Sequence, residues 1–103
     1  MKRDEYLKAF KRQYKKLMTI NKTMSGHTKE AWVWATLTQN TVAIIRLLEE
    51  EPISKSMIKK VALIMEKNLT ETLKNVVPDD LLLVRVKDLV ISIISFCSSK
   101  KKK

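Results

Sequence analysis

The sequence predicts an all-α protein, folded as a single-domain, four-helix, up-down-up-down bundle. Composition is the first reason, because the 103 residues include one glycine and two prolines and are 45% hydrophobic, as is typical of helical proteins. Second, apolar residues recur at spacings of three and four in four stretches. Third, short polar segments separate these stretches, and short connections make successive helices antiparallel. The expected helices span residues 3–20, 28–50, 53–76 and 80–97 of a bundle covering residues 1–99, and residues 100–103 are expected to form a disordered lysine tail.

The first expected helix is amphipathic. Asp4 and Glu5 occupy its first turn, where acidic side chains interact favourably with the helix dipole. Its apolar stripe repeats at helical spacing and comprises Tyr6, Leu7, Phe10, Tyr14 and Leu17. The opposite arc is basic and comprises Lys8, Lys11, Arg12, Lys15 and Lys16. We therefore expect the stripe to face the core and the arc to face outward.

The second expected helix carries no charge from Ala31 through Ile45, and its apolar side chains point in nearly all directions. A helix with this pattern is usually buried, and its charge-free length is too short to span a bilayer. We therefore expect it to be the central helix of the bundle. The polar segment before it contains Gly26, and Ser25 or Thr28 can serve as its N-cap.

The second expected helix ends before Pro52, because the residue before a proline is disfavoured in helical geometry. The third helix begins near Ser54, or with Pro52 in its first turn, and Asp79 is the expected N-cap of the fourth. β-Branched residues in the fourth segment favour strands, so a hairpin turning at Lys87 and Asp88 is the alternative. We favour a helix because no glycine or Asn-Gly pair is present to form a tight turn. Polar residues also recur there at helical spacing: Arg85, Asp88, Ser92, Ser95 and Ser99.

The second and fourth expected helices carry more apolar surface than one partner helix covers. A symmetric homodimer would bury this surplus, and a groove for an apolar peptide helix is the alternative. The residues expected at this subunit or partner interface are Trp32, Trp34, Leu37, Ile44 and Ile45.

The net charge of +10 is concentrated at the two ends of the chain. Residues 1–24 carry eight basic and two acidic side chains, a sum of +6, and residues 100–103 add +4. Such polarised charge indicates a polyanionic partner: nucleic acid, an anionic membrane surface or an acidic protein segment. We favour nucleic acid, DNA or RNA, bound without sequence specificity, because lysines at helical spacing can follow phosphates but rarely read bases. The expected contacts are Lys8, Lys11, Arg12, Lys15, Lys16, Lys100, Lys101, Lys102 and Lys103.

A solvated face that only keeps the protein soluble is the alternative interpretation of the basic arc. A basic amphipathic helix can also bind a membrane surface. The bundle needs the apolar side of this helix, however, so we do not expect a membrane partner. For a small helical protein that binds nucleic acid in this way, we expect a viral, phage or plasmid setting.

The sequence offers no constellation of residues for catalysis. His27 stands in a polar segment without other metal-binding residues, and a zinc site needs three or four ligands. The sequence places no base beside Cys97, and a single glycine cannot build a glycine-rich phosphate loop. We therefore expect no enzymatic activity, no cofactor and no metal site. One cysteine excludes an intramolecular disulfide and the N-terminus lacks an apolar signal core, so we expect an intracellular protein.

Two segments resemble parts of a known family. Residues 47–54, LLEEEPIS, followed by residues 57–60, are similar to the junction of the second and third helices in transcription elongation factor N-terminal domains. Residues 86–90, VKDLV, are similar to the last helix of those domains. The chain differs at the family's Ile-Gly step, where it has Leu63-Ile64, and at the family's tryptophan, where it has Ile93. The resemblance implies a helical bundle that binds short disordered motifs of other transcription factors, and this is the second functional hypothesis.

Overall fold

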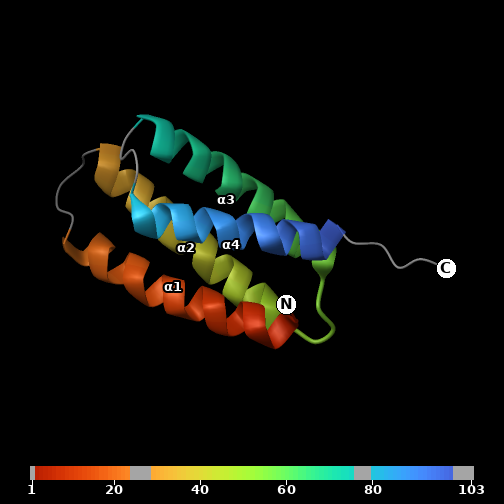
Figure 1. Ribbon diagram of the computed structural model, residues 1–103. Coiled ribbons are helices and arrows are strands. Elements are labelled where there is room, and N and C mark those ends of the chain that lie inside the picture. Colours follow the sequence, from red (N-terminus) through yellow and green to blue (C-terminus); the bar gives the residue numbers. More distant parts are fainter. Residues whose placement is uncertain (1, 24–28, 76–79, 99–103) are drawn as a thin grey trace.

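The computed structural model describes residues 2–23, 29–75 and 80–98, and in these residues the chain forms four α-helices and no strand (Figure 1). The helices are α1 (Arg3–Thr23), α2 (Lys29–Glu49), α3 (Lys55–Asn75) and α4 (Leu81–Ser98). The all-α fold class is therefore confirmed, and the fourth segment is a helix rather than the alternative hairpin. The peptide bond between Glu51 and Pro52, in the connection from α2 to α3, is cis.

Side-chain caps fix the starts of three helices. The Ser54 hydroxyl accepts a hydrogen bond from the Met57 amide at 3.4 Å, and this contact caps α3. The Asp80 carboxylate accepts from the Leu83 amide at 3.1 Å at the start of α4. Asp80 is therefore the cap of α4 that the structure shows. The expected cap, Asp79, lies outside the described residues, as do Ser25, Gly26 and Thr28. At the start of α1, the Glu5 carboxylate accepts from the Lys2 amide at 2.8 Å.

Each helix packs against neighbours in an order that follows the chain. α2 lies between α1 and α3, and α4 packs extensively against α3 and over a smaller area against α1. Figure 1 shows α1 and α3 on opposite sides of the molecule, with α4 crossing in front of α2. These neighbour relations are compatible with the expected up-down-up-down order.

One hydrophobic core receives side chains from all four helices. Its fully buried members include Phe10, Leu17, Leu37, Ile44, Leu48, Ile58, Met65, Leu69, Leu83, Val86, Val90 and Ile93. Two buried threonines of α2 have partners: Thr38 and Thr41 donate to the carbonyls of Trp34 and Leu37, one turn earlier, at 2.8 and 2.9 Å. The indole of Trp34 donates to the Glu30 carboxylate at 3.4 Å. On α1, the spacing of apolar residues in the sequence identifies the buried side, where Tyr6, Phe10 and Leu17 lie.

Tyr6 joins α1 to α4. Its hydroxyl lies 3.0 Å from the Ser92 carbonyl oxygen and 2.6 Å from the Ser92 hydroxyl. Its ring packs against Phe96 with centroids 5.2 Å apart, and the Lys55 ammonium lies 4.5 Å from the Phe96 centroid. The polar position at residue 92 therefore contacts another helix rather than solvent alone.

The expectation that α2 is buried on all sides is wrong. Trp34 is 2% exposed, whereas Trp32 is 70% exposed, and Gln39 and Arg46 also face solvent. α2 has two neighbouring helices, so one side of it remains open to water. Uncharged residues such as Gln39 and Ala43 lie on that side, so the lack of charge in the sequence does not mean that the side is buried.

The same burial bears on the residues expected at the interface. Four of its five residues lie in the core of a single chain: Trp34, Leu37, Ile44 and Ile45. Their side chains pack in the core, so little of their apolar surface is left for a second subunit or a peptide. Of the expected interface residues, only Trp32 remains on the surface.

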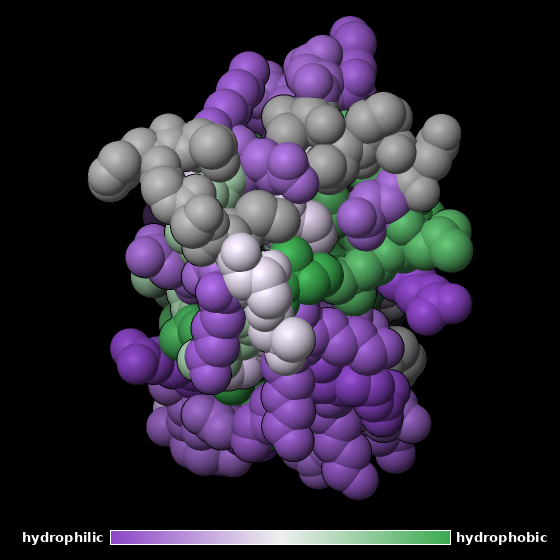
Figure 2. Space-filling model, turned by 90° about the vertical axis from the view of Figure 1, so that its left-hand side faces the viewer, coloured by the Kyte–Doolittle hydropathy of each residue, from purple (hydrophilic) through white to green (hydrophobic). Residues whose placement is uncertain are grey.

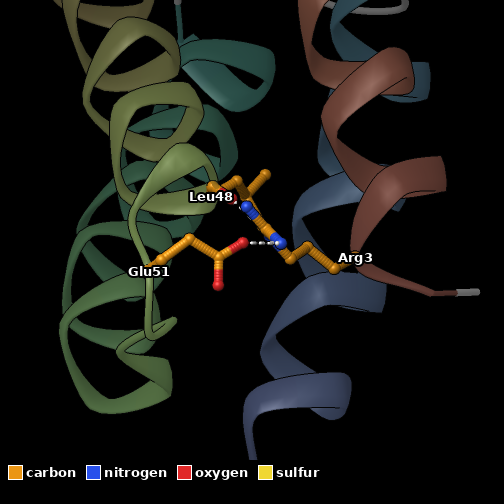
Figure 3. A network of polar contacts seen from close by, with 3 residues as sticks. All are labelled: Arg3, Leu48 and Glu51. Atoms are coloured by element: carbon orange, nitrogen blue, oxygen red, sulfur yellow. Dashed lines mark hydrogen bonds and ion pairs between the residues drawn. The ribbon is translucent and has the colours of Figure 1, made fainter.

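Arg3 connects the start of α1 to the end of α2 (Figure 3). Its Nε donates to the Leu48 carbonyl oxygen at 2.6 Å, and its Nη1 donates to Glu51 Oε2 at 2.7 Å. The last carbonyls of a helix have no partner within the helix, so Arg3 satisfies one of them from outside. A cation at this position also interacts favourably with the α2 dipole.

We expect Arg3→Ala to lower the free energy of unfolding by about 1–2 kcal/mol, because a charge-assisted hydrogen bond to a helix-end carbonyl is lost. Glu51→Gln should cost less than about 0.5 kcal/mol, because the Glu51 side chain is 75% exposed and exposed ion pairs contribute little. Urea unfolding of both variants measures the difference. Equal losses would mean that the ion pair, rather than the carbonyl contact, holds the two helix ends together.

Candidate nucleic-acid interface

The five basic residues predicted to bind phosphate all lie on the exposed side of α1. Lys8, Lys11, Arg12, Lys15 and Lys16, called the basic face below, are exposed. Phe10 and Leu17, on the opposite side of the same helix, are fully buried. The helix therefore turns its apolar stripe to the core and its cations to solvent, as its sequence pattern predicts.

The basic face keeps most of its charge unpaired. Lys11 lies 3.2 Å from Glu49 of α2, with Nζ and Oε2 as the closest atoms. Within the described part of the chain, the other four cations make no ion pair. No acidic residue occurs between Tyr6 and Thr23, so the field along this surface of α1 is positive over about four turns.

Lys22 extends the basic face, and the sequence prediction missed it. Lys22 is exposed and lies seven residues after Lys15, two helical turns farther along the same side of α1. The sequence prediction ended the helix at residue 20, whereas α1 continues to Thr23. The spacing of seven was the signal that could have identified it.

An open groove runs beside the basic face, between α1 and α2. Its volume is about 370 Å³, and its lining residues are Lys11, Tyr14, Lys15, Val42, Ile45, Arg46 and Glu49. A second hollow continues it along α2 and shares Tyr14, Val42 and Arg46 with it, adding Thr38, Gln39 and Ala43. We call the two together the α1–α2 groove. Short side chains at positions 42 and 43 leave space between the long basic side chains of the two helices.

Arg46 and Tyr14 come together in the groove only because α1 packs against α2. Arg46 is exposed on α2 and lines the groove opposite Lys15 of α1. Tyr14 packs against the core, as its place in the apolar stripe predicts, but it is only half-buried and also lies in the wall of the groove. The register of α1 against α2 decides both positions, and no pattern within either helix encodes it.

Large apolar side chains are exposed on three helices: Trp32 on α2, three residues on α4, and Met57, Leu63 and Ile64 on α3. Leu81 is 72% exposed, Ile91 is 45% exposed and Val84 is 39% exposed. Figure 2 shows the end of the bundle at which α1 ends and α4 begins. Hydrophilic residues cover its lower part, where α1 lies, and hydrophobic residues gather on the side where α4 lies. The basic face of α1 and the exposed apolar residues of α4 therefore lie on different helices.

A smaller cleft of about 140 Å³ lies between α2 and α3. Trp32 and Val33 contribute apolar surface to it, and Asn68 and Glu71 contribute polar groups. It lacks the cationic edges of the α1–α2 groove, having Lys29 as its single basic lining residue.

The structure bears only in part on the expectations about the lysine tail, a metal site and a membrane span. Lys100, Lys101, Lys102 and Lys103 lie outside the described residues, as does His27. In the described ranges, no three metal-binding side chains of His, Cys, Asp or Glu come together. None of the helices there has an apolar stretch of the length needed to cross a bilayer.

Cys97 is half-buried near the end of α4. Burial disfavours the thiolate and raises the pKa of Cys97, while the nearby ammonium groups of Lys55 and Lys59 lower it by less. The thiol is therefore more protonated at neutral pH than a free cysteine, which makes it a poor nucleophile.

We expect the pH profile of Cys97 alkylation by iodoacetamide to lie at higher pH in the folded protein than in urea-unfolded protein. The raised pKa keeps the thiol protonated, so the folded chain needs more alkaline buffer to reach half of its maximal rate. Mass spectrometry at a series of pH values measures the midpoint, which limited access alone would not move. Coincident midpoints would contradict the prediction.

Comparison of the chain with known protein families, with curated protein sequences and with solved structures found no match.

Proposed function

We propose that this protein binds nucleic acid through the basic face of α1, by contacts to phosphates that do not depend on base sequence. The observation that supports the proposal most directly is the set of four cations on one helix with no acidic partner in the described residues. A positive surface of this kind attracts polyanions and gains free energy by releasing their counterions.

The dimensions and residue types fit backbone contacts. Lys8 and Lys16 are separated by about 12 Å along the helix axis, at 1.5 Å per residue. Measured along the duplex axis, one strand carries a phosphate about every 3.4 Å, so this length corresponds to about three phosphates when α1 lies parallel to that axis. Four of the five cations are lysines, which hold phosphates as point charges and lack the planar fork with which arginine reads guanine.

The proposal takes the four helices as an up-down-up-down bundle. The Arg3 contact brings the start of α1 to the end of α2, and the Tyr6 contact brings it to Ser92, in the second half of α4. Both contacts are those expected when neighbouring helices alternate in direction. In this arrangement the outer side of α1 is not covered by another helix.

We also propose that two copies pair through α4 rather than through α2. Leu81, Val84 and Ile91 expose apolar surface there, and the exposed Arg85 and Asp88 lie one turn apart on the same helix. In a two-fold antiparallel pair of α4 helices, residue i faces residue j while j faces i. Arg85 of each copy would then lie opposite Asp88 of the other, so the surface is complementary to itself.

A protein-interaction module is the second candidate function. The cleft beside Trp32 is the specific observation in its favour, because exposed aromatic residues in clefts are frequent anchors for peptide partners. The same surface would serve the motif-binding role suggested by the resemblance to transcription elongation factor domains. Recovery of one protein partner after nuclease treatment, lost with Trp32→Ala but kept when the basic face is neutralised, would favour this function.

We expect Lys8→Gln, Arg12→Gln and Lys16→Gln together to weaken duplex DNA binding at low salt by at least about tenfold, because three phosphate contacts are lost. The dependence of log affinity on log salt should become shallower by about 2.7, at about 0.9 per contact. Fluorescence anisotropy at several salt concentrations measures both quantities.

The matched control is the triple change of Lys60, Lys67 and Lys74 to glutamine. These lysines are exposed on α3, so both triple variants lower the net charge from +10 to +7. The control should keep most of the affinity and slope of the wild-type chain. Equal losses in the two variants would show that total charge, rather than the basic face, determines binding.

We expect Ile91→Lys to abolish dimer formation through α4, because a charge would be buried at the apolar surface of the pair. Light scattering of the wild-type chain should give a mass approaching twice 12.0 kDa as concentration rises, and Ile91→Lys should remain at 12.0 kDa. Ile64→Lys, at an exposed position of α3, is the control and should dimerise normally. A wild-type mass of 12.0 kDa at all concentrations, in moderate salt, would reject the pairing.

A further inference from the structure

The α1–α2 groove has a tyrosine between two cationic edges. Lys11 and Lys15 are exposed on the α1 side, and Arg46 is exposed on the α2 side. Tyr14 lines both hollows of the groove and so lies near its middle. Val42, also shared by both hollows, adds apolar surface beside the tyrosine ring.

We propose that this groove holds an unstacked base of single-stranded nucleic acid against Tyr14, with the flanking phosphates contacted by Lys15 and Arg46. The inference rests on the proposed function and makes it more specific, because it names the single strand as the preferred form. A basic groove lined by an aromatic side chain is the usual combination for single-strand binding.

A duplex cannot use the tyrosine. Its bases are stacked on one another, and only their edges reach the grooves. A single strand can turn a base out and place its face on an aromatic ring, and every base has such a face. Tyr14 therefore adds affinity for single strands without adding sequence specificity, whereas the outer cations of α1 serve both forms.

Glu49 limits the site at one end. Its carboxylate lies 3.2 Å from the Lys11 ammonium, so Lys11 is partly neutralised and a phosphate close to Glu49 would be repelled. The strand is expected to leave the groove toward the other hollow, which Gln39 and Thr38 line. The exposed Gln39 amide can donate to or accept from any base edge.

The test compares a labelled oligothymidylate with a labelled duplex of the same length, using fluorescence anisotropy with the wild-type chain and two variants. Tyr14→Leu removes the aromatic face and should weaken binding of the single strand by about tenfold. It should change binding of the duplex by less than about twofold. Tyr14→Phe keeps the aromatic face and should bind both probes like the wild type.

Two further readouts separate stacking from charge and from misfolding. The salt dependence of binding should be the same for Tyr14→Leu and wild type, because the lost contact carries no charge. Trp32→Leu, which removes an exposed aromatic ring outside the groove, should leave both affinities unchanged. Circular dichroism checks that Tyr14→Leu retains its helices, and Tyr14→Phe tests the same position if the leucine variant does not fold.

Each outcome has a distinct meaning. Binding of both probes by the wild type, with Tyr14→Leu weakening both equally or neither, would overturn the groove assignment and leave the basic-face proposal standing. If the Tyr14→Leu variant does not fold, the test rests on Tyr14→Phe. Loss of the preference for the single strand over the duplex in Tyr14→Phe would also overturn the groove assignment. Absence of binding to either probe at low salt would reject both proposals.

Discussion

Burial of the apolar stripe of α1 is the constraint on which the proposed interface depends. Phe10 and Leu17 are fully enclosed by the other helices, so α1 cannot rotate about its own axis without exposing them to water at a cost of several kcal/mol. That fixed rotation sets the direction of every lysine on the opposite side. The Tyr6 contact to Ser92 and the Arg3 contact to Leu48 fix the same helix at its N-terminal end. A structural core thus holds the cations in a constant arrangement.

Charge in the sequence determines how far the fold could be predicted. Lysines and arginines mark the outer side of α1, so both its helical state and its orientation follow from spacing alone. α2 has no charged residue between Ala31 and Ile45, so nothing marks its outer side. Trp32 and Trp34 lie two positions apart, about 200° around the helix, and the structure buries one and exposes the other. The sequence shows two equivalent aromatic residues, and only the packing against α1 and α3 distinguishes them.

The candidate site divides in the same way. The basic face belongs to one helix and could be predicted from its periodicity. The α1–α2 groove belongs to two helices, and its content depends on which residues of α2 lie beside Tyr14. Arg46 directly follows the uncharged residues 31–45, and the sequence alone indicates only an isolated cation near the end of a core helix. The side-by-side placement of α1 and α2 makes it an edge of the groove, and such register between helices is a tertiary property.

Salt acts in opposite directions on the two proposed associations. Added salt weakens phosphate binding, because releasing counterions into a more concentrated salt solution gains less entropy. It also screens the repulsion between two chains that each carry a charge of +10, so pairing through α4 is strengthened. Pairing through α4 would leave the basic face of each copy exposed, because α1 and α4 share only a small contact area. A nucleic-acid strand that reaches both faces would then bind the second at a high effective concentration. Bound phosphate would meanwhile neutralise part of the charge that opposes pairing, so the two associations should reinforce each other at low salt.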